Sequence, residues 1–243
     1  MAGRCSNATA FHGLRAKKGM DWQAISLSLR LAACTTLALL LMGLPLAYWL
    51  AQTRWRWRFL VEAVVALPIV LPPTVLGFYV LMAIGPLSPL GRAYEALVGH
   101  RLPFTFEGLL IASVLYSLPF AVQPFASAFA TVDRRMMEAS RCLGVGGLGT
   151  FIRIVLPLAW PGVLTGVVLS FAHTLGEFGV VLMIGGNLPG ITRTASISIY
   201  DQVQALNYSA ANQTSLALLL FSFFVLAVTY GLQRRLVHLW PTH

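Results

Sequence analysis

Four polar side chains stand out because they lie inside a long apolar segment and are spaced by three and four residues. On a helix this spacing places them on one stripe: Ser170, His173, Thr174 and Glu177. Hydroxyl groups on such a stripe could donate hydrogen bonds to a polar solute. An ionisable residue inside a membrane segment is a functional candidate, and we expect Glu177 to accept backbone or hydroxyl donors and to fix a gate. The stripe is our candidate for the wall of a translocation pathway.

A second polar group lies upstream, between two apolar segments. Asp133 could cap a short helix, and Arg134 and Glu138 are spaced for an i,i+4 ion pair. Gly144 falls where a left-handed residue commonly ends a helix. A glycine-rich turn and a second short helix are expected to follow. We call this helix–turn–helix segment the knob. It could lie on lipid headgroups or bind another protein, and geometry alone favours neither interpretation.

Other chemistry is excluded by what the sequence lacks. Residues 144–149 fit the dinucleotide pattern G-x-G-x-x-G, but they follow a helix and no βαβ unit surrounds them. No lysine follows Lys18, so the chain has no Walker A loop. Its three cysteines have no metal-ligand spacing. We therefore expect no catalytic residue, metal or cofactor on this chain, and any ATP and Mg²⁺ must be bound by a partner.

The composition places the chain in a lipid bilayer. Charged residues make up 10% of its 243 residues, whereas about 25% is usual for a soluble domain. Apolar residues make up 57%, more than a soluble core of this size can use. The net charge of +9 does not indicate nucleic-acid binding, because the arginines lie between apolar segments rather than on one face.

Five stretches are long and apolar enough to span a bilayer, which predicts an all-α integral membrane protein. Prolines at 68, 72 and 73 must kink or interrupt the second stretch, and Gly176–Gly179 could break the fourth. Broken helices at membrane depth are tolerated where they line a cavity, so these two stretches are the expected pathway walls. The five predicted spans are Ile25–Ala51, Phe59–Ile84, Leu109–Ala130, Leu158–Ile184 and Leu216–Leu232.

The distribution of arginine predicts the orientation. Three segments on one side hold nine of the 17 basic residues, whereas the opposite loops hold only Arg92, Arg101 and Arg193. By the positive-inside rule the arginine-rich side is cytoplasmic, which leaves the N-terminus outside. The nine are Arg54, Arg56 and Arg58, then Arg134, Arg135, Arg141 and Arg153, then Arg234 and Arg235.

The N-terminal tail disagrees with this orientation because it carries four basic residues before Met20. Translation from Met20 would remove them, so residues 1–24 are interpreted as an extension that is unstructured at least to residue 19. The permease domain then covers residues 25–235, with the knob at residues 132–157. Residues 236–243 are expected to form a cytoplasmic tail.

The knob resembles the EAA motif of bacterial ABC-importer permeases. Six residues match at the spacing of that motif, and Ser140 falls within the same segment: Glu138, Ala139, Gly144, Ile154, Leu156 and Pro157. The resemblance implies that these seven residues form a coupling segment that docks an ATPase. It also implies a homodimer that binds two ATPase subunits, a periplasmic oxyanion-binding protein and a location in the bacterial inner membrane.

A second resemblance concerns the substrate. Leu175–Gly179 resembles permeases for tetrahedral oxyanions, and Asn187–Thr194 is most similar to their molybdate branch. His173 stands where many relatives have arginine, and Ile191 where glutamate is common. The family implies import of molybdate or tungstate by alternating access.

Alternatives remain open. The nearest is a sulfate or thiosulfate permease. A secondary transporter is less favoured, because the sequence has no inverted repeat and no ion-coupling carboxylate pair. A scaffold that only anchors an ATPase would not need broken helices or a polar stripe.

Overall fold

The structure is a computed structural model that describes residues 20–239, with side chains described up to residue 231. Every regular element in this range is a helix, so the expected all-α fold is confirmed. The elements in order are α1 Trp22–Gln52, α2 Arg58–Val70, α3 Pro73–Ile84, α4 Pro89–Val98, α5 Phe106–Ala130, α6 Arg134–Cys142, α7 Gly147–Thr150, a π-helical turn Phe151–Val155, α8 Leu156–Gly176, α9 Gly179–Gly185, α10 Ala195–Gln204 and α11 Tyr208–Leu239.

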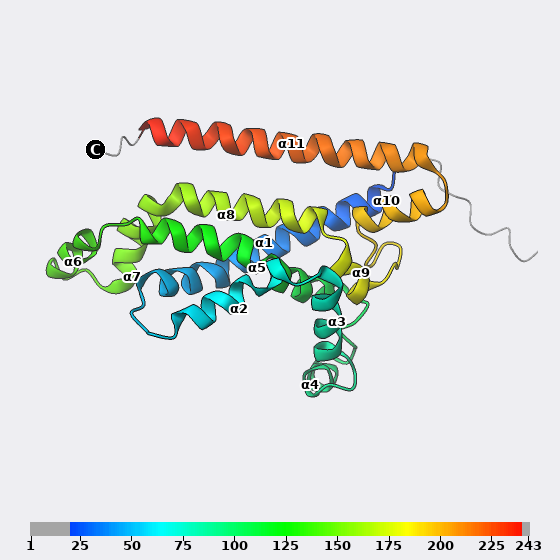
Figure 1. Cartoon of the computed structure of the whole chain (residues 1–243), viewed down its shortest axis with the longest axis horizontal. Coiled ribbons are helices and arrows are strands. Elements are labelled where there is room, and N and C mark those ends of the chain that lie inside the picture. Colours follow the sequence, from blue (N-terminus) through cyan, green and yellow to red (C-terminus); the bar gives the residue numbers. More distant parts are fainter. Residues whose placement is uncertain (1–19, 240–243) are drawn as a thin grey trace, which may run out of the picture.

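The four longest helices run along one direction, with α1, α5 and α8 packed together and α11 beside α8 and α10 (Figure 1). The largest buried cluster joins the first three and includes Leu39, Val122, Phe125, Phe129 and Val163. The bundle forms because apolar side chains cover these helices on all sides, which lets one face pack on a neighbour while the other faces lipid.

Small residues bring α5 and α8 close together. A Cβ added at Gly166 would lie 2.5 Å from the ring of Phe125, and one added at Gly162 would lie 2.4 Å from the Cβ of Ala128. Between membrane helices the driving force is close van der Waals packing rather than the hydrophobic effect. These contacts therefore hold the α5–α8 pair, which carries most of the predicted stripe.

Four helices are long and apolar enough to span a membrane, and the pair α2–α3 would be a fifth span if it counts as one. The prediction that prolines interrupt the second span is confirmed, because α2 ends at Val70 and α3 begins at Pro73 with a bend of 115°. This bend turns α3 away from the bundle, and α4 lies at its far end (Figure 1).

The fourth predicted span is also broken at the expected place. Helix α8 ends at Gly176, Glu177 is extended, and α9 begins at Gly179. The fifth predicted span is longer than expected, since α11 begins at Tyr208 rather than near Leu216.

Two predicted boundaries can be compared with the ends of the helices. Helix α1 begins at Trp22, where the Asp21 carboxylate accepts a hydrogen bond from the Ala24 amide, so residues 22–24 belong to the first helix rather than to the extension. Helix α11 continues to Leu239, so residues 236–239 are helical. The predicted unstructured segment 1–19 and the end of the tail, residues 240–243, lie outside the described residues.

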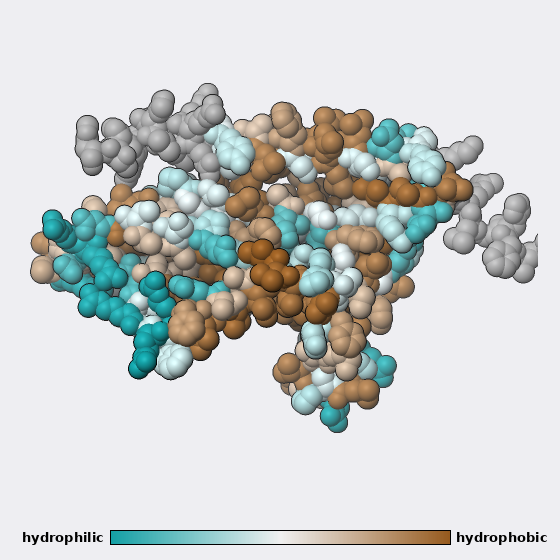
Figure 2. All heavy atoms as spheres, in the orientation of Figure 1, coloured by the Kyte–Doolittle hydropathy of each residue, from teal (hydrophilic) through white to brown (hydrophobic). Residues whose placement is uncertain are grey.

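The surface separates into apolar and polar regions along the bundle (Figure 2). Apolar side chains cover its length, including the exposed Leu41, Val64 and Phe223. Polar residues gather at the end that carries α6 and the loop between α1 and α2 (Figure 2). The C-terminal end of α11 lies at this same end (Figure 1), so all three arginine-rich segments of the sequence are brought together.

Candidate functional site

The coupling segment forms a compact projection at one end of the bundle (Figure 1). The Asp133 side chain caps α6 by accepting from the Arg135 amide at 2.9 Å, as expected. Gly144 has φ +78°, and the Val145 amide then donates to the Ser140 carbonyl. This left-handed glycine reverses the chain because only a residue without a Cβ adopts that conformation freely.

The matched residues of the segment are divided between its surface and its interior. Glu138, Ala139, Gly144 and Pro157 are exposed, whereas Ile154 and Leu156 are half-buried. Ser140 is buried, and its hydroxyl is hydrogen-bonded to that of Thr150 at 2.9 Å. Ser140 therefore holds α6 against α7 rather than facing outward.

The second short helix of the coupling segment, which we also call the knob, is not separate from the membrane helix that follows it, contrary to our expectation. It begins at Gly147 and continues through the π-helical turn into α8, so that one helical stretch runs from Gly147 to Gly176. The backbone is therefore helical without interruption from the knob to the end of α8. The expected ion pair between Arg134 and Glu138 is absent from the salt bridges of the described residues.

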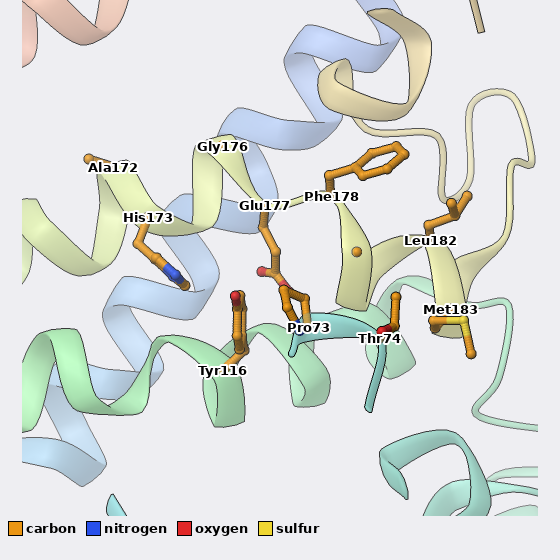
Figure 3. A pocket seen from close by; sticks show the side chains of 11 residues that line it. Pro73, Thr74, Tyr116, Ala172, His173, Gly176, Glu177, Phe178, Leu182 and Met183 are labelled. Carbon is orange, nitrogen blue, oxygen red and sulfur yellow. The ribbon is translucent and has the colours of Figure 1, made fainter. Parts of the chain in front are cut away.

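At the other end of α8 a pocket of about 660 Å³ opens where both broken helices are interrupted (Figure 3). Two residues of the predicted stripe, His173 and Glu177, line it, with Tyr116 from α5 and Thr74 from α3. The remaining lining residues are Pro73, Ala172, Gly176, Phe178, Gly179, Leu182 and Met183.

The other two stripe residues are buried in the contact between α5 and α8. Ser170 donates to the Val167 carbonyl at 3.0 Å, and Thr174 donates to the Ser170 carbonyl at 2.9 Å. Both side chains are at most 3% exposed. The stripe is therefore split, with Ser170 and Thr174 in the helix contact and His173 and Glu177 at the pocket.

A chain of hydrogen bonds connects the two halves of the stripe. The Ser117 hydroxyl lies 2.8 Å from the Thr174 hydroxyl and 2.9 Å from Nδ1 of His173. Because Thr174 gives its proton to the Ser170 carbonyl, Ser117 must donate to Thr174 and accept from His173. Neutral His173 therefore carries its proton on Nδ1, and its Nε2 offers a lone pair rather than a donor.

The His173 ring is also fixed by aromatic contacts. It stacks on Phe120 with ring centroids 3.8 Å apart and lies 4.8 Å from the ring of Tyr116. In Figure 3 the imidazole points toward Tyr116. A neutral imidazole held in this way is a poor anion ligand, which leaves the hydroxyls of Tyr116 and Thr74 as the donors at the pocket.

Glu177 is the first residue after α8 and is only 4% exposed. Within the described part of the chain neither carboxylate oxygen has a hydrogen-bond partner, although the Ser113 hydroxyl is close enough to interact with it. The expectation that Glu177 accepts backbone or hydroxyl donors and fixes a gate stays a prediction. The carboxylate extends toward Pro73 at the start of α3 (Figure 3).

Sequence reasoning missed the contribution of α5. Single serine residues in a membrane helix commonly bond to their own backbone, so Ser113, Tyr116 and Ser117 do not stand out in the sequence. Their spacing of three and four residues, with Pro119 and Phe120 following, is the same signal as the stripe on α8. Only the pairing of α5 with α8 shows that the two stripes face each other.

Helices α3 and α9 pack so closely that they form one unit. A Cβ at Gly77 would lie 2.9 Å from the Cβ of Met183, and one at Gly179 would lie 2.8 Å from that of Pro73. Each helix joins the bundle through a short non-helical break, at residues 71–72 and 177–178. Both breaks therefore lie beside the same pocket.

The Asn187–Thr194 segment forms a rigid loop before α10. Arg193 donates from Nε to the side-chain oxygen Oδ1 of Asn187 at 2.6 Å and pairs with Asp201, which also accepts from the Asn187 side chain. Thr192 donates to the Gly185 carbonyl at 2.6 Å. The polar groups of these side chains are hydrogen-bonded to one another or to the backbone. The Asn187–Thr194 loop therefore fixes the position of α9 relative to α10 in this structure.

Comparison with known proteins identifies the family. Residues 43–238 match the family described as binding-protein-dependent transport system inner membrane component. The molybdenum transport system permease protein ModB of Azotobacter vinelandii is 51% identical over 214 residues, which cover 88% of this chain and 95% of that protein. ModB of Escherichia coli K12 is 35% identical over 76% of this chain and 80% of that protein.

Solved structures support the same fold. A bacterial alginate ABC transporter, solved in complex with its alginate-bound periplasmic protein, matches with a TM-score of 0.71 at 17% identity over 88% of this chain and 78% of that chain. The MetNI methionine transporter matches with a TM-score of 0.69 at 16% identity over 89% of this chain and 95% of that chain. The chain belongs to the family of binding-protein-dependent transport system inner membrane components, as a multi-pass permease subunit and not the ATPase.

Proposed function

We propose that this chain is the permease of an ATP-driven importer that moves molybdate, or the similar tungstate, into the cytoplasm. The observation that carries the proposal is the 51% identity to a molybdenum permease over 95% of that protein's length. The match to the Escherichia coli protein points to the same substrate. A sulfate or thiosulfate permease is the second candidate, because sulfate is also a tetrahedral dianion.

The proposed assembly contains two copies of this chain, two ATPase subunits and a periplasmic binding protein. The family description names dependence on a binding protein, and the related alginate transporter was solved with its periplasmic protein. One coupling segment per chain requires two chains to engage two ATPases. The exposed Glu138, Ala139 and Gly144 are the proposed contacts on each segment.

The proposed orientation places α6 and the C-terminal end of α11 in the cytoplasm. Its support is the gathering of three arginine-rich segments at one end of the bundle (Figure 1). The pocket at the α8–α9 break then lies toward the outer side, where a binding protein would deliver the anion.

In the proposed cycle, closure of the ATPases moves the two coupling segments, and the continuous helix from Gly147 to Gly176 transmits this motion to the break at Glu177. The α3–α9 unit then turns about the two breaks, which act as hinges, and opens the pathway outward. His173 and Glu177 lie at the hinge, with Ser170 and Thr174 fixing the helix that carries them. Few donors face the pocket, which suits a pathway whose affinity resides in the binding protein.

The test is ATPase activity of the complete transporter in liposomes with its binding protein. We expect molybdate and tungstate to stimulate hydrolysis and sulfate to have no effect. Stimulation by sulfate alone would overturn the substrate and leave the permease assignment intact. Hydrolysis that ignores all three anions but responds to another solute would remove the oxyanion class.

A further inference from the structure

A second polar pocket, of about 350 Å³, lies at the opposite end of the bundle from the hinge. It is formed between the last turns of α1 and one face of α6. We call it the basic pocket, and its lining residues are Tyr48, Gln52, Arg54, Arg134, Met137, Glu138 and Arg141. Apart from Glu138, none of these residues has a part in the proposed transport cycle.

The fold assembles the basic pocket from two helices and a loop. Arg134, Glu138 and Arg141 are spaced by four and three residues, so they share one face of α6. Arg54 follows the end of α1, where the Thr53 amide donates to the Trp49 carbonyl at 2.8 Å. The ring of Tyr48 is fixed by contacts with Phe129 and Phe151, which gives the pocket a rigid wall. Met137, which is 4% exposed, closes it toward the core.

The charge of the basic pocket is not balanced by the described residues that line it. Three arginines line it with a single glutamate. The salt bridges of the described residues are Arg58–Glu62, Arg101–Glu95 and Arg193–Asp201, so none involves an arginine of the pocket. Three positive charges brought together without partners repel one another, and an anion between them relieves this repulsion.

The neighbours of the basic pocket place it at the membrane–water boundary. Trp49 and Trp55 lie with ring centroids 6.2 Å apart, and the Arg56 guanidinium lies 5.3 Å from the Trp57 ring. Exposed tryptophans of this kind sit at the level of lipid headgroups. Figure 2 shows that the same end of the molecule changes from apolar to polar. The basic pocket is therefore within reach of both headgroups and water.

We propose that the basic pocket binds one phosphate-like tetrahedral anion, with Arg54, Arg134 and Arg141 as donors. Guanidinium groups suit this ligand because their paired N–H groups match the oxygens of phosphate. The anion is either the headgroup phosphate of an anionic lipid or a free oxyanion in water. In both cases it bridges the end of α1 to α6 and so ties the coupling segment to the bundle. The assignment of the leaflet as cytoplasmic rests on the proposed orientation.

The first experiment counts bound lipids. The complete transporter is purified from membranes of phosphatidylcholine and phosphatidylglycerol, and retained lipids are counted by native mass spectrometry. The test variant is Arg54→Gln with Arg141→Gln. Its matched control is Arg56→Gln with Arg135→Gln, which removes the same charges from the same loop and helix but outside the pocket. We expect the test variant to bind phosphatidylglycerol roughly 30-fold more weakly than the control.

The second experiment adds inorganic phosphate or molybdate to the transporter in a zwitterionic detergent free of anionic lipid, and follows tryptophan fluorescence. Loss of phosphatidylglycerol from the test variant alone identifies a headgroup as the ligand. A saturable fluorescence response that the test variant alone lacks identifies a free oxyanion. Test and control variants that behave identically in both experiments overturn the proposal. Neither measurement depends on transport, so failure of the molybdate assignment would leave this inference standing.

Discussion

At the scale of single residues, the unusual feature is that a histidine and a carboxylate lie at one pocket but are satisfied differently. His173 is held by Ser117, Phe120 and Tyr116, whereas both oxygens of Glu177 lack hydrogen-bond partners within the described residues. A buried polar group with hydrogen-bond partners stabilises the fold. A buried polar group without such partners lowers the stability of the fold, which suggests that it serves the function of the protein instead. The two residues therefore call for separate tests.

Ser117→Ala should destabilise the α5–α8 pair. The substitution removes the acceptor of the His173 Nδ1–H and the donor to Thr174, leaving buried polar groups unpaired. We expect a loss of about 1–3 kcal/mol in the free energy of unfolding, measured as thermal unfolding in detergent micelles. Ser127→Ala, an exposed change on the same helix, is the control and should have an effect of no more than about 0.5 kcal/mol. Equal stability of the two variants would mean that the hydrogen-bond chain contributes nothing.

Glu177→Gln should separate stability from transport. The amide keeps the shape of the side chain but replaces its carboxyl group, so we expect the thermal stability to be unchanged or higher. If the carboxyl group fixes the gate, molybdate uptake into liposomes should fall by about tenfold, which corresponds to a lost interaction of about 1.4 kcal/mol. Glu107→Gln, an exposed change at the start of α5, serves as the control. Normal uptake by Glu177→Gln would exclude a role for the carboxyl group.

At the scale of elements, two broken helices meet at their breaks. The α2–α3 bend of 115° and the extended Glu177 between α8 and α9 border the same pocket, and glycines let α3 and α9 pack closely. Both helices also pack on α5, since Val80, Val180 and Ile184 share a buried cluster with Ala112. A movement of the α3–α9 unit would therefore have to rearrange its contact with α5.

Gly179→Ala should disturb this unit, because its Cβ would lie 2.8 Å from that of Pro73 and must push α9 away from α3. We expect uptake to fall severalfold while ATP hydrolysis continues, since the coupling segment is untouched. Both rates are measured on the same liposomes. Gly176→Ala is the matched control at the same break, since a Cβ there meets no atom within 4 Å. A similar loss in the control would mean that the break tolerates no side chain, and the contact with α3 would then have no special part.

At the scale of the whole molecule, the two ends of α8 lie in different surroundings. One end continues without interruption into the coupling segment, and the other stops at the pocket. In the proposed cycle the first end docks the ATPase and the second is a hinge, so one continuous helix would carry a displacement from one to the other.

Gly144→Ala should uncouple the transporter without unfolding it. Gly144 has φ +78°, a conformation that costs an alanine roughly 1 kcal/mol or more, so the turn after α6 should change shape. We expect stimulation of ATP hydrolysis by the loaded binding protein to be lost, as measured in liposomes. Gly146→Ala is the control, because a Cβ at either position meets no atom within 4 Å and only Gly144 has a positive φ. Full stimulation in Gly144→Ala would show that the turn is not part of the coupling.

The sequence by itself determined the fold class, both helix breaks and the family. Apolar length, proline positions and the six-residue pattern around Glu138 are local properties, and each follows from covalent geometry or from the cost of placing polar groups in lipid. The cap at Asp133 and the left-handed Gly144 followed for the same reason.

Only the tertiary structure decided which polar residues face each other. The spacing predicts one stripe of Ser170, His173, Thr174 and Glu177, yet it could not show that α5 covers part of this stripe or that Glu177 lies just beyond the end of α8. Likewise, Arg54 and Arg141 are 87 residues apart and meet only because α6 folds back beside the end of α1. The periodicity of a sequence indicates the direction in which each side chain leaves its own helix. A site also depends on the neighbouring helix, and the packing of glycines and aromatic rings decides which helix that is.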